Sequence, residues 1–377
     1  METVNRQVLL FLSVVSICSV TYAGNLSPQL AALASGKSTS RQIQTSQKLM
    51  PPGPFDARID NQNRVQVYIH SATTETPLVS AAELTMLNAV NIVPSPLLRV
   101  VQAWVPISKL NLLASLPGVG RVTIPAYARM PHPVRPSAQH HSNNTLGSHA
   151  SALTSIQSRT ESVATGLQID QEALSTMQAD QLQTVNATGR GIKVGVISDD
   201  NSGLADSQAA GYLPVSVWAD PTYPGTTPTP GDPAEGTAML EGIHAMAPDA
   251  ELGFCGPNTT VDFLDCYQDF IAWGANAITD DLGYSLLDMF TTGSTSDDSF
   301  AAAIVQITGV NPNVAFTSSG GNDAQDYFQG VFTPYPSSSL MDFGGTNALN
   351  FYLAAGDEFD LLLEWNDPIN TSPDHFT

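Results

Sequence analysis

Between residues 64 and 125, the spacing of apolar residues switches between the period of a strand and that of a helix. The runs RVQVYIH, LLRVVQAWVPI and GVGRVTIP have the character of strands, and the middle run supplies two of them. AAELTMLNAVN and SKLNLLASL, which lie between these runs, repeat as helices. Residues 64–125 are therefore predicted to form a small α+β domain with the order β-α-β-β-α-β.

A second patterned region covers residues 176–330. It opens with an amphipathic helix in MQADQLQTVNATGRG and continues with IKVGVIS, an uninterrupted apolar run typical of a parallel strand buried on both faces. The strand-like runs VSVWA, AELGFC, NAITDDLGYS and NVAFTSSGGN then alternate with helical runs such as VDFLDCYQDFIAWGA. This succession predicts an α/β fold with a doubly wound parallel sheet.

The first 23 residues have the pattern of a secretory signal peptide. Arg6 precedes the apolar run VLLFLSVVSICSV and a small-residue ending, with cleavage expected after Ala23. The run is too short for a stable membrane anchor, and no second apolar stretch of about eighteen residues follows it. The mature protein is therefore expected to be secreted or periplasmic.

Three further segments lie outside the two predicted domains. Residues 24–63 are polar and aperiodic, as in a leader or linker, and residues 126–175 have the Ser-, His- and Pro-rich composition of a disordered linker. The linker histidines lack carboxylate or Cys partners at ligand spacing, which disfavours a metal tract. In residues 331–377 the runs MDFGGTN, LNFYLAAGD and EFDLLLEWNDP alternate as antiparallel strands, and they predict a β insertion that is incomplete where the chain stops.

Charge and cysteine content narrow the range of partners. The formal net charge of −21 opposes binding to nucleic-acid phosphates and to anionic membranes. Cys18 leaves with the signal peptide, so Cys255 and Cys266 remain in a compartment that permits oxidation. We predict a disulfide between them, the alternative being two buried thiols, and their spacing does not fit a metal site.

Polar residues gather at the predicted carboxyl ends of the parallel strands, where α/β sheets bind their ligands. Two predicted strands end in a pair of aspartates, at residues 199–200 and 280–281, and a third strand is followed by Asn322. Glu235 is the first residue of a predicted helix that lies between the two aspartate pairs in the sequence. We expect these groups to meet on one rim of the sheet. Simpler explanations stand beside this one: Glu235 suits a helix macrodipole, Asn322 suits a turn, and the 280–281 pair suits Ca²⁺ ligation, although a cleft wall is favoured for that pair. No other cofactor is indicated.

Four blocks, GRGIKVGVISDD, EGTAM, NAITDDLGYS and FTSSGGND, together resemble the subtilisin-like serine peptidases, in the exported branch that carries a β insertion. The domain that ends in VTIP is similar to the inhibitory propeptides of such enzymes. The resemblance implies proteolysis by acyl transfer. It also implies two sets of residues, the catalytic Asp199, Glu235 and Asn322, with Asn322 as oxyanion donor, and the cleft-lining Asp281, Gly283, Ser319 and Gly320.

One departure from that family concerns the general base. Glu235 stands where the family has its catalytic His, whereas the related sedolisins use Ser, Glu and Asp at acidic pH. A buried carboxylate beside a second acid has a raised pKa, which suits it to take a proton from a serine hydroxyl. The partner is expected to be Asp199 or Asp200, since Met239 occupies the sedolisin position and a gapless alignment puts the family's Asp on Ser198.

A second departure concerns the nucleophile. The family's Gly-Thr-Ser motif does not occur between Asn322 and Thr377, and Ser318 and Ser319 belong to a strand end. The chain is therefore expected to be a fragment of a serine endopeptidase, or inactive as it stands. The alternative is a non-catalytic pseudopeptidase that binds extended peptides by strand addition. In either case the expected partner is a peptide or protein substrate, and the protein is expected to be a monomer.

Overall fold

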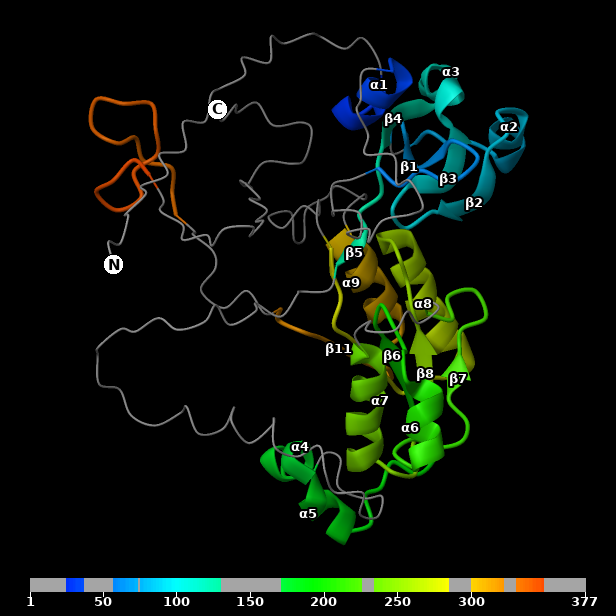
Figure 1. Ribbon diagram of the computed structural model, residues 1–377, viewed down its shortest axis with the longest axis vertical. Helices are drawn as coiled ribbons and strands as arrows, with labels where there is room; N and C mark the ends of the chain where they lie inside the picture. The colour runs from blue at the N-terminus through cyan, green and yellow to red at the C-terminus, as the bar shows by residue number, and fades with distance from the viewer. Residues whose placement is uncertain are drawn as a thin grey trace, which may run out of the picture. The chain divides into compact units, whose positions relative to one another are not determined.

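The computed structural model describes residues 25–36, 57–73, 75–129, 171–225, 234–284, 300–321 and 330–348 (Figure 1). The chain divides into two compact units, one made of residues 1–125, 286–303 and 366–377, the other of residues 126–285 and 304–365. The predicted signal peptide lies outside the described residues, as do residues 130–170 of the predicted linker and residues 349–377 of the predicted β insertion.

The first unit contains the predicted β-α-β-β-α-β domain, built on a four-stranded antiparallel sheet of order β2-β3-β1-β4. Its strands are β1 (Arg64–Ser71), β2 (Val90–Ser95), β3 (Val100–Pro106) and β4 (Val119–Thr123). The run LLRVVQAWVPI was expected to supply two strands, but it contains β3 alone, and β2 begins inside the run that was predicted as a helix. Its helices are α2 (Ala81–Met86), the 3-10 turn η1 (Ile107–Lys109) and α3 (Leu110–Ala114). Strand β1 is buried from Val65 to Ile69, and its alternate side chains Val65, Val67 and Ile69 lie in the core with Leu84 and Leu110, as the two-residue period of a strand requires.

The absence of structure expected for residues 24–63 is wrong for part of that segment. Helix α1 (Pro28–Ala34) belongs to the same core, because Leu30 is fully buried in it. The helix is attached to β4 by two backbone hydrogen bonds, Ser27 N to Val122 O (2.8 Å) and Val122 N to Asn25 O (2.6 Å). A helix of seven residues is too short to show a clear helical period in the sequence.

The second unit contains a five-stranded sheet of order β11-β9-β6-β8-β7 in which every pairing is parallel. Its strands are β6 (Lys193–Ile197), β7 (Trp218–Ala219), β8 (Glu251–Cys255), β9 (Ala277–Asp280) and β11 (Ala315–Ser318). From β6 the chain proceeds to one edge of the sheet and returns through β8, then crosses to β9 and β11 on the other side. The strand order thus reverses between β6 and β9, the place where ligands bind in such sheets.

In the part of the chain that the structure describes, this sheet is accompanied by the helices α4 (Gln171–Thr176), α5 (Ala179–Thr184), α6 (Leu204–Ala210), α7 (Glu235–Met246), α8 (Thr260–Trp273) and α9 (Phe300–Val310). Helix α4 begins inside the segment predicted as linker. Buried side chains from β6, α7 and β8, among them Val196, Leu240 and Phe254, form a core cluster. A side chain at Gly195 of β6 would lie 2.6 Å from the ring of Phe270 of α8, so glycine is what lets this ring lie against the sheet.

A short strand pair occupies the start of the predicted linker. β5 (Ala128–Arg129) pairs antiparallel with β10 (Gly283–Tyr284). On its other side the same segment is bonded to the loop before α8, through Ala128 N to Asn258 O (2.8 Å) and Thr260 N to Ala126 O (3.2 Å). The linker boundary at residue 126 is therefore wrong, because residues 126–129 are held between two other segments.

The strand predicted for MDFGGTN is also wrong. In residues 330–348 the structure has a single isolated bridge, Pro334 to Met341, followed by a turn closed by Phe343 N to Thr346 O (2.7 Å). Gly344 and Gly345 have φ angles of 91° and 94°, a left-handed conformation that ends a strand. Among the described residues, no helix combines the length and the apolar character that crossing a membrane requires.

Candidate active site

The ends of β6 and β9 bring two polar side chains together. The two strands are parallel neighbours with Ile197 opposite Asp280, so the next residues, Ser198 and Asp281, follow at the same level. The Ser198 hydroxyl donates to Oδ2 of Asp281 over 3.2 Å. Ser198 has no exposed surface and Asp281 is only 9% exposed. This buried contact forms the floor of the site.

Helix α7 begins directly beside this floor. Glu235 is its first residue, and the amide of Gly236 donates to the carbonyl oxygen of Asp200 (3.1 Å). A Cβ atom at Gly236 would lie 3.0 Å from Cβ of Ser198 and 2.5 Å from the Phe254 ring, and closer still to the Asp200 oxygen. Glycine is therefore required after Glu235, because only a residue without a side chain lets the helix start at the strand end.

Thr237 completes this attachment. Its hydroxyl, which is buried, donates to the carbonyl oxygen of Ser202 over 2.8 Å. Asp200 serves the same loop, because its Oδ1 accepts the amide of Ser202. The amide of Gly236 and the hydroxyl of Thr237 thus fix the start of α7 to the loop after β6, and this holds Glu235 at the rim. Asp200 is committed to the loop, which leaves Asp199 as the other acid of this strand end.

The carboxylates on this rim repel one another. The pKa of Asp281 is raised to about 7, first because burial disfavours its charged form and next because Glu235 lies near it. Asp199 raises this pKa further, while the hydroxyl of Ser198 lowers it. Asp281 therefore feels the negative charge of both Glu235 and Asp199.

Asp280, the neighbour of Asp281, has a different environment. Its Oδ2 accepts the hydroxyl of Tyr267 (2.9 Å) and its Oδ1 accepts the hydroxyl of Ser318 (2.8 Å). Burial raises its pKa and these two donors oppose the rise. Asp280 therefore joins β9 to α8 and β11, and it is a structural residue.

The other predicted site residues are distributed around this rim. Gly283 lies in β10, and Ser319 and Gly320 are exposed after β11, with the amide of Ser319 bonded to the Asp280 carbonyl (3.0 Å). Asn322 lies outside the described residues. His244 belongs to the last turn of α7, at the end opposite Glu235, and burial lowers its pKa.

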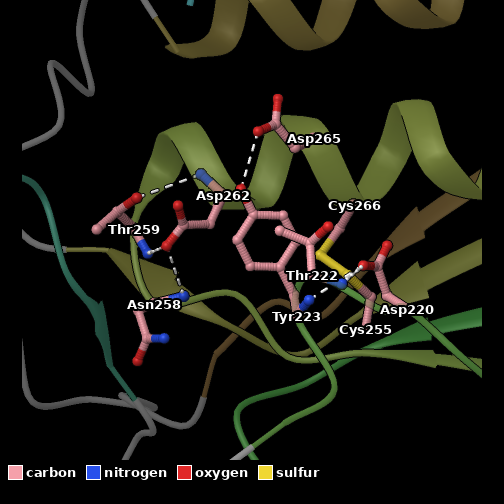
Figure 2. The surroundings of a disulfide bond; sticks show 9 residues. All are labelled: Asp220, Thr222, Tyr223, Cys255, Asn258, Thr259, Asp262, Asp265 and Cys266. Carbon is pink, nitrogen blue, oxygen red and sulfur yellow. Dashed lines mark hydrogen bonds between the residues drawn. A yellow bond between two sulfur atoms is a disulfide. The ribbon is translucent and has the colours of Figure 1, made fainter. Parts of the chain in front are cut away.

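Cys255 and Cys266 form a disulfide that joins the end of β8 to α8, with a Cα–Cα distance of 5.9 Å (Figure 2). Tyr223 lies beside it and donates its hydroxyl to Oδ2 of Asp265 over 2.9 Å. Oδ1 of Asp220 accepts the backbone amides of Thr222 (2.7 Å) and Tyr223 (3.0 Å). This region is also rich in acids, but among the described residues no group of three or more His, Cys, Asp or Glu side chains is arranged to hold a metal ion.

Two features of the site were not predicted from the sequence. The contact between Ser198 and Asp281 depends on β6 and β9 being neighbours, although the aspartates at two strand ends were a signal that the ends meet. The role of Thr237 had a signal in the block EGTAM, where a threonine two residues after Glu235 stands among small and apolar residues.

The geometry defines a rim of carboxylates at the carboxyl ends of a parallel α/β sheet. No family model matches the chain, and no curated protein matches it. Similar solved structures include MycP1 from Mycobacterium smegmatis, at 20% identity and a TM-score of 0.28, with 44% of this chain and 49% of that chain covered. MycP1 without its N-terminal propeptide has 23% identity and a TM-score of 0.25, with coverages of 44% and 53%.

A third similar structure is that of EpiP, an epidermin leader peptide processing serine protease from Staphylococcus aureus. Its identity is 11% and its TM-score 0.35, with 71% of this chain and 65% of that chain covered. The chain thus spans about half of the MycP1 structures and just under two thirds of EpiP. Likenesses at these TM-scores do not define a function, which has to be inferred from the site itself.

Proposed function

We propose that the rim formed by Glu235, Asp199 and Asp281 is the acid–base part of a serine peptidase active site of the subtilase kind, in an exported protein. The observation that carries the proposal is the attachment of Glu235, which Gly236 and Thr237 fix at the strand ends beside two other acids. A helix macrodipole is worth about 0.3–1 kcal/mol to such a glutamate. Repulsion between Glu235 and the Asp281 carboxylate opposes that gain, so a chemical role accounts for the arrangement better.

In this proposal each group has a distinct task. Glu235 takes the proton from a serine hydroxyl as that oxygen attacks a peptide carbonyl, and later returns it to the leaving amine. Asn322 donates to the oxyanion. Ser198 is not the nucleophile, because it is fully buried and donates to Asp281. The nucleophile is assigned to a part of the polypeptide other than the described residues.

Peptide hydrolysis between about pH 3 and pH 8 tests the proposal. The chain is compared with a form extended through any reading frame downstream of Thr377, and Glu235→Gln with the control Glu241→Gln, a substitution further along α7. We expect the extended form to hydrolyse casein with an acidic optimum, Glu235→Gln to abolish this activity and Glu241→Gln to retain it. Full activity of Glu235→Gln, or no hydrolysis by either form, overturns the proposal.

A second function, peptide binding without hydrolysis, is supported by strand β5. Residues 126–129 lie extended between the loop at Asn258 and strand β10, bonded through backbone atoms on both sides. Backbone pairing of this kind is how a sheet edge binds an extended peptide. The test is fluorescence anisotropy of a labelled peptide with the sequence of residues 126–130, added to the chain after cleavage within residues 130–170. Saturable binding that a scrambled peptide does not show supports the module, and equal binding of both peptides rejects it.

A further inference from the structure

Two segments of the second unit bond to the backbone of residues 126–129, and together we call them the β5 site. The first is the loop at residues 258–260, through Ala128 N to Asn258 O (2.8 Å) and Thr260 N to Ala126 O (3.2 Å). The second is β10, which pairs antiparallel with β5. Every residue except proline offers the same backbone groups, so these bonds hold an extended chain without reading its sequence. Selectivity at the β5 site therefore has to come from side chains.

One side chain of the segment is both large and buried. Tyr127 is 2% exposed, and both of its neighbours in the chain are alanine. It lies opposite Thr259, the N-cap of α8, in an isolated antiparallel bridge (Figure 2 shows the position of Thr259). Directly opposed residues of an antiparallel pair have their side chains on the same face, and Thr259 has no exposed surface. Tyr127 is therefore buried on the side where α8 begins.

Aromatic rings are present on both sides of the segment. Phe263 lies one turn after Thr259 on α8 and is 3% exposed, and Tyr284 lies in β10 opposite Ala128. The rings of Phe263 and Tyr284 meet edge to face, with their centroids 5.5 Å apart. The Phe263 ring is also 4.9 Å from that of Tyr267. The two segments that bond to β5 thus share an aromatic cluster, and aromatic rings pack favourably against other rings.

We propose that the β5 site selects extended peptides by one aromatic residue, tyrosine or phenylalanine, at the position of Tyr127, and that Tyr127 itself competes for this position. This inference rests on the peptide-binding function given above and deepens it, since it names the class of peptide. The backbone bonds on both sides hold the peptide in an extended conformation. The buried ring supplies the selectivity, because a few buried aromatic residues carry most of the binding energy at an interface.

Fluorescence anisotropy with variants of the full chain tests this selection. The probes are two labelled peptides, AYARM, which has the sequence of residues 126–130, and AAARM, which lacks the tyrosine. Tyr127→Ala removes the chain's own anchor, so AYARM should bind this variant at least about 30-fold more tightly than it binds the unsubstituted chain. AAARM should bind the same variant at least about 30-fold more weakly than AYARM does.

Hydrogen exchange of single amides gives a second readout that needs no added peptide. The amides of Ala128 and Thr260 donate across the β5 site, and the amide of Phe263 donates within the first turn of α8. In Tyr127→Ala the first two should exchange about 30-fold faster, because the segment has lost its anchor, while the Phe263 amide should keep its protection. Tyr127→Phe keeps the ring and should match the unsubstituted chain in both assays. Tyr212→Ala, the same substitution after α6, is the matched control.

The two readouts separate this inference from the function on which it rests. Equal binding of AYARM and AAARM by Tyr127→Ala overturns the aromatic selection and leaves peptide binding intact. Faster exchange in Tyr127→Ala without binding of either peptide supports the anchor within the chain and rejects the binding of separate peptides. Unchanged exchange of the Ala128 and Thr260 amides in Tyr127→Ala overturns the inference regardless of the peptide result.

Discussion

The packing of Gly236 allows a quantitative test of how α7 is attached. In Gly236→Ala the new methyl group would lie 2.5 Å from the Phe254 ring and 3.0 Å from Cβ of Ser198, and nearer still to the Asp200 carbonyl oxygen. Overpacking of this kind costs about 1–3 kcal/mol, and the upper end applies because the nearest atom belongs to the backbone. Alanine returns about 1 kcal/mol through its helix propensity. The net loss of local stability is therefore about 2 kcal/mol.

Gly242, in the same helix, supplies the matched control. A methyl group there would have no atom within 4 Å, so Gly242→Ala should gain about 0.5–1 kcal/mol from propensity alone. Native-state hydrogen exchange of peptides from α7 is the suitable assay, because a chain with two units need not unfold in one step. Exchange should be about 30-fold faster in Gly236→Ala and about 2- to 5-fold slower in Gly242→Ala. Equal protection in the two variants would refute the packing argument.

Three further predictions concern other contacts of this unit. Thr237→Val should lower stability by about 1–2 kcal/mol, because it removes a buried hydroxyl from a loop carbonyl, and Thr237→Ser should restore most of the loss in urea unfolding. Removing the disulfide by Cys255→Ala with Cys266→Ala should cost about 2–3 kcal/mol, given a sequence separation of 11, and thermal unfolding with and without reductant checks this. The pKa of Asp269 is raised to about 6, mainly by burial and then by Asp220. The folded state therefore holds this proton when the unfolded state has lost it, so stability should fall as the pH rises from about 4 to about 6, and Asp269→Asn should flatten that part of a pH–stability curve.

The pattern of apolar residues was sufficient to predict most of the elements but not all of their partners. The β-α-β-β-α-β order and the parallel strands follow from local periodicity, because each strand of the second unit is a short apolar run between helices. That polar residues would gather at strand ends also follows from the fold class. Which strands are neighbours does not follow from either, so local patterns do not favour a contact between Ser198 and Asp281 over one between Asp199 and Glu235.

In two of the segments predicted wrongly, strand β5 and helix α1, too few residues carry the signal. Strand β5 has two residues, and its hydrogen bonds are made by backbone atoms whose partners lie more than 100 positions away. In helix α1, Leu30 is the one large side chain that is fully buried. In MDFGGTN the alternation of residue types is present, but two glycines in the left-handed conformation turn the chain instead of extending it.

The adjacent aspartates at the end of β9 affect how related chains should be aligned. Successive side chains of a strand point to opposite faces. An alignment that is shifted by one position therefore exchanges Asp280, which joins three elements, for Asp281, which faces the rim. Identity at either position therefore says little unless the face is known. The same ambiguity applies at residues 198–200, where a serine and two aspartates serve the floor, the rim and the loop. Relatives of this protein are best compared by the hydrogen-bond partner of each acid. A chain that has both aspartates but lacks Ser198 or Tyr267 would match at the aspartate positions and still have a different site.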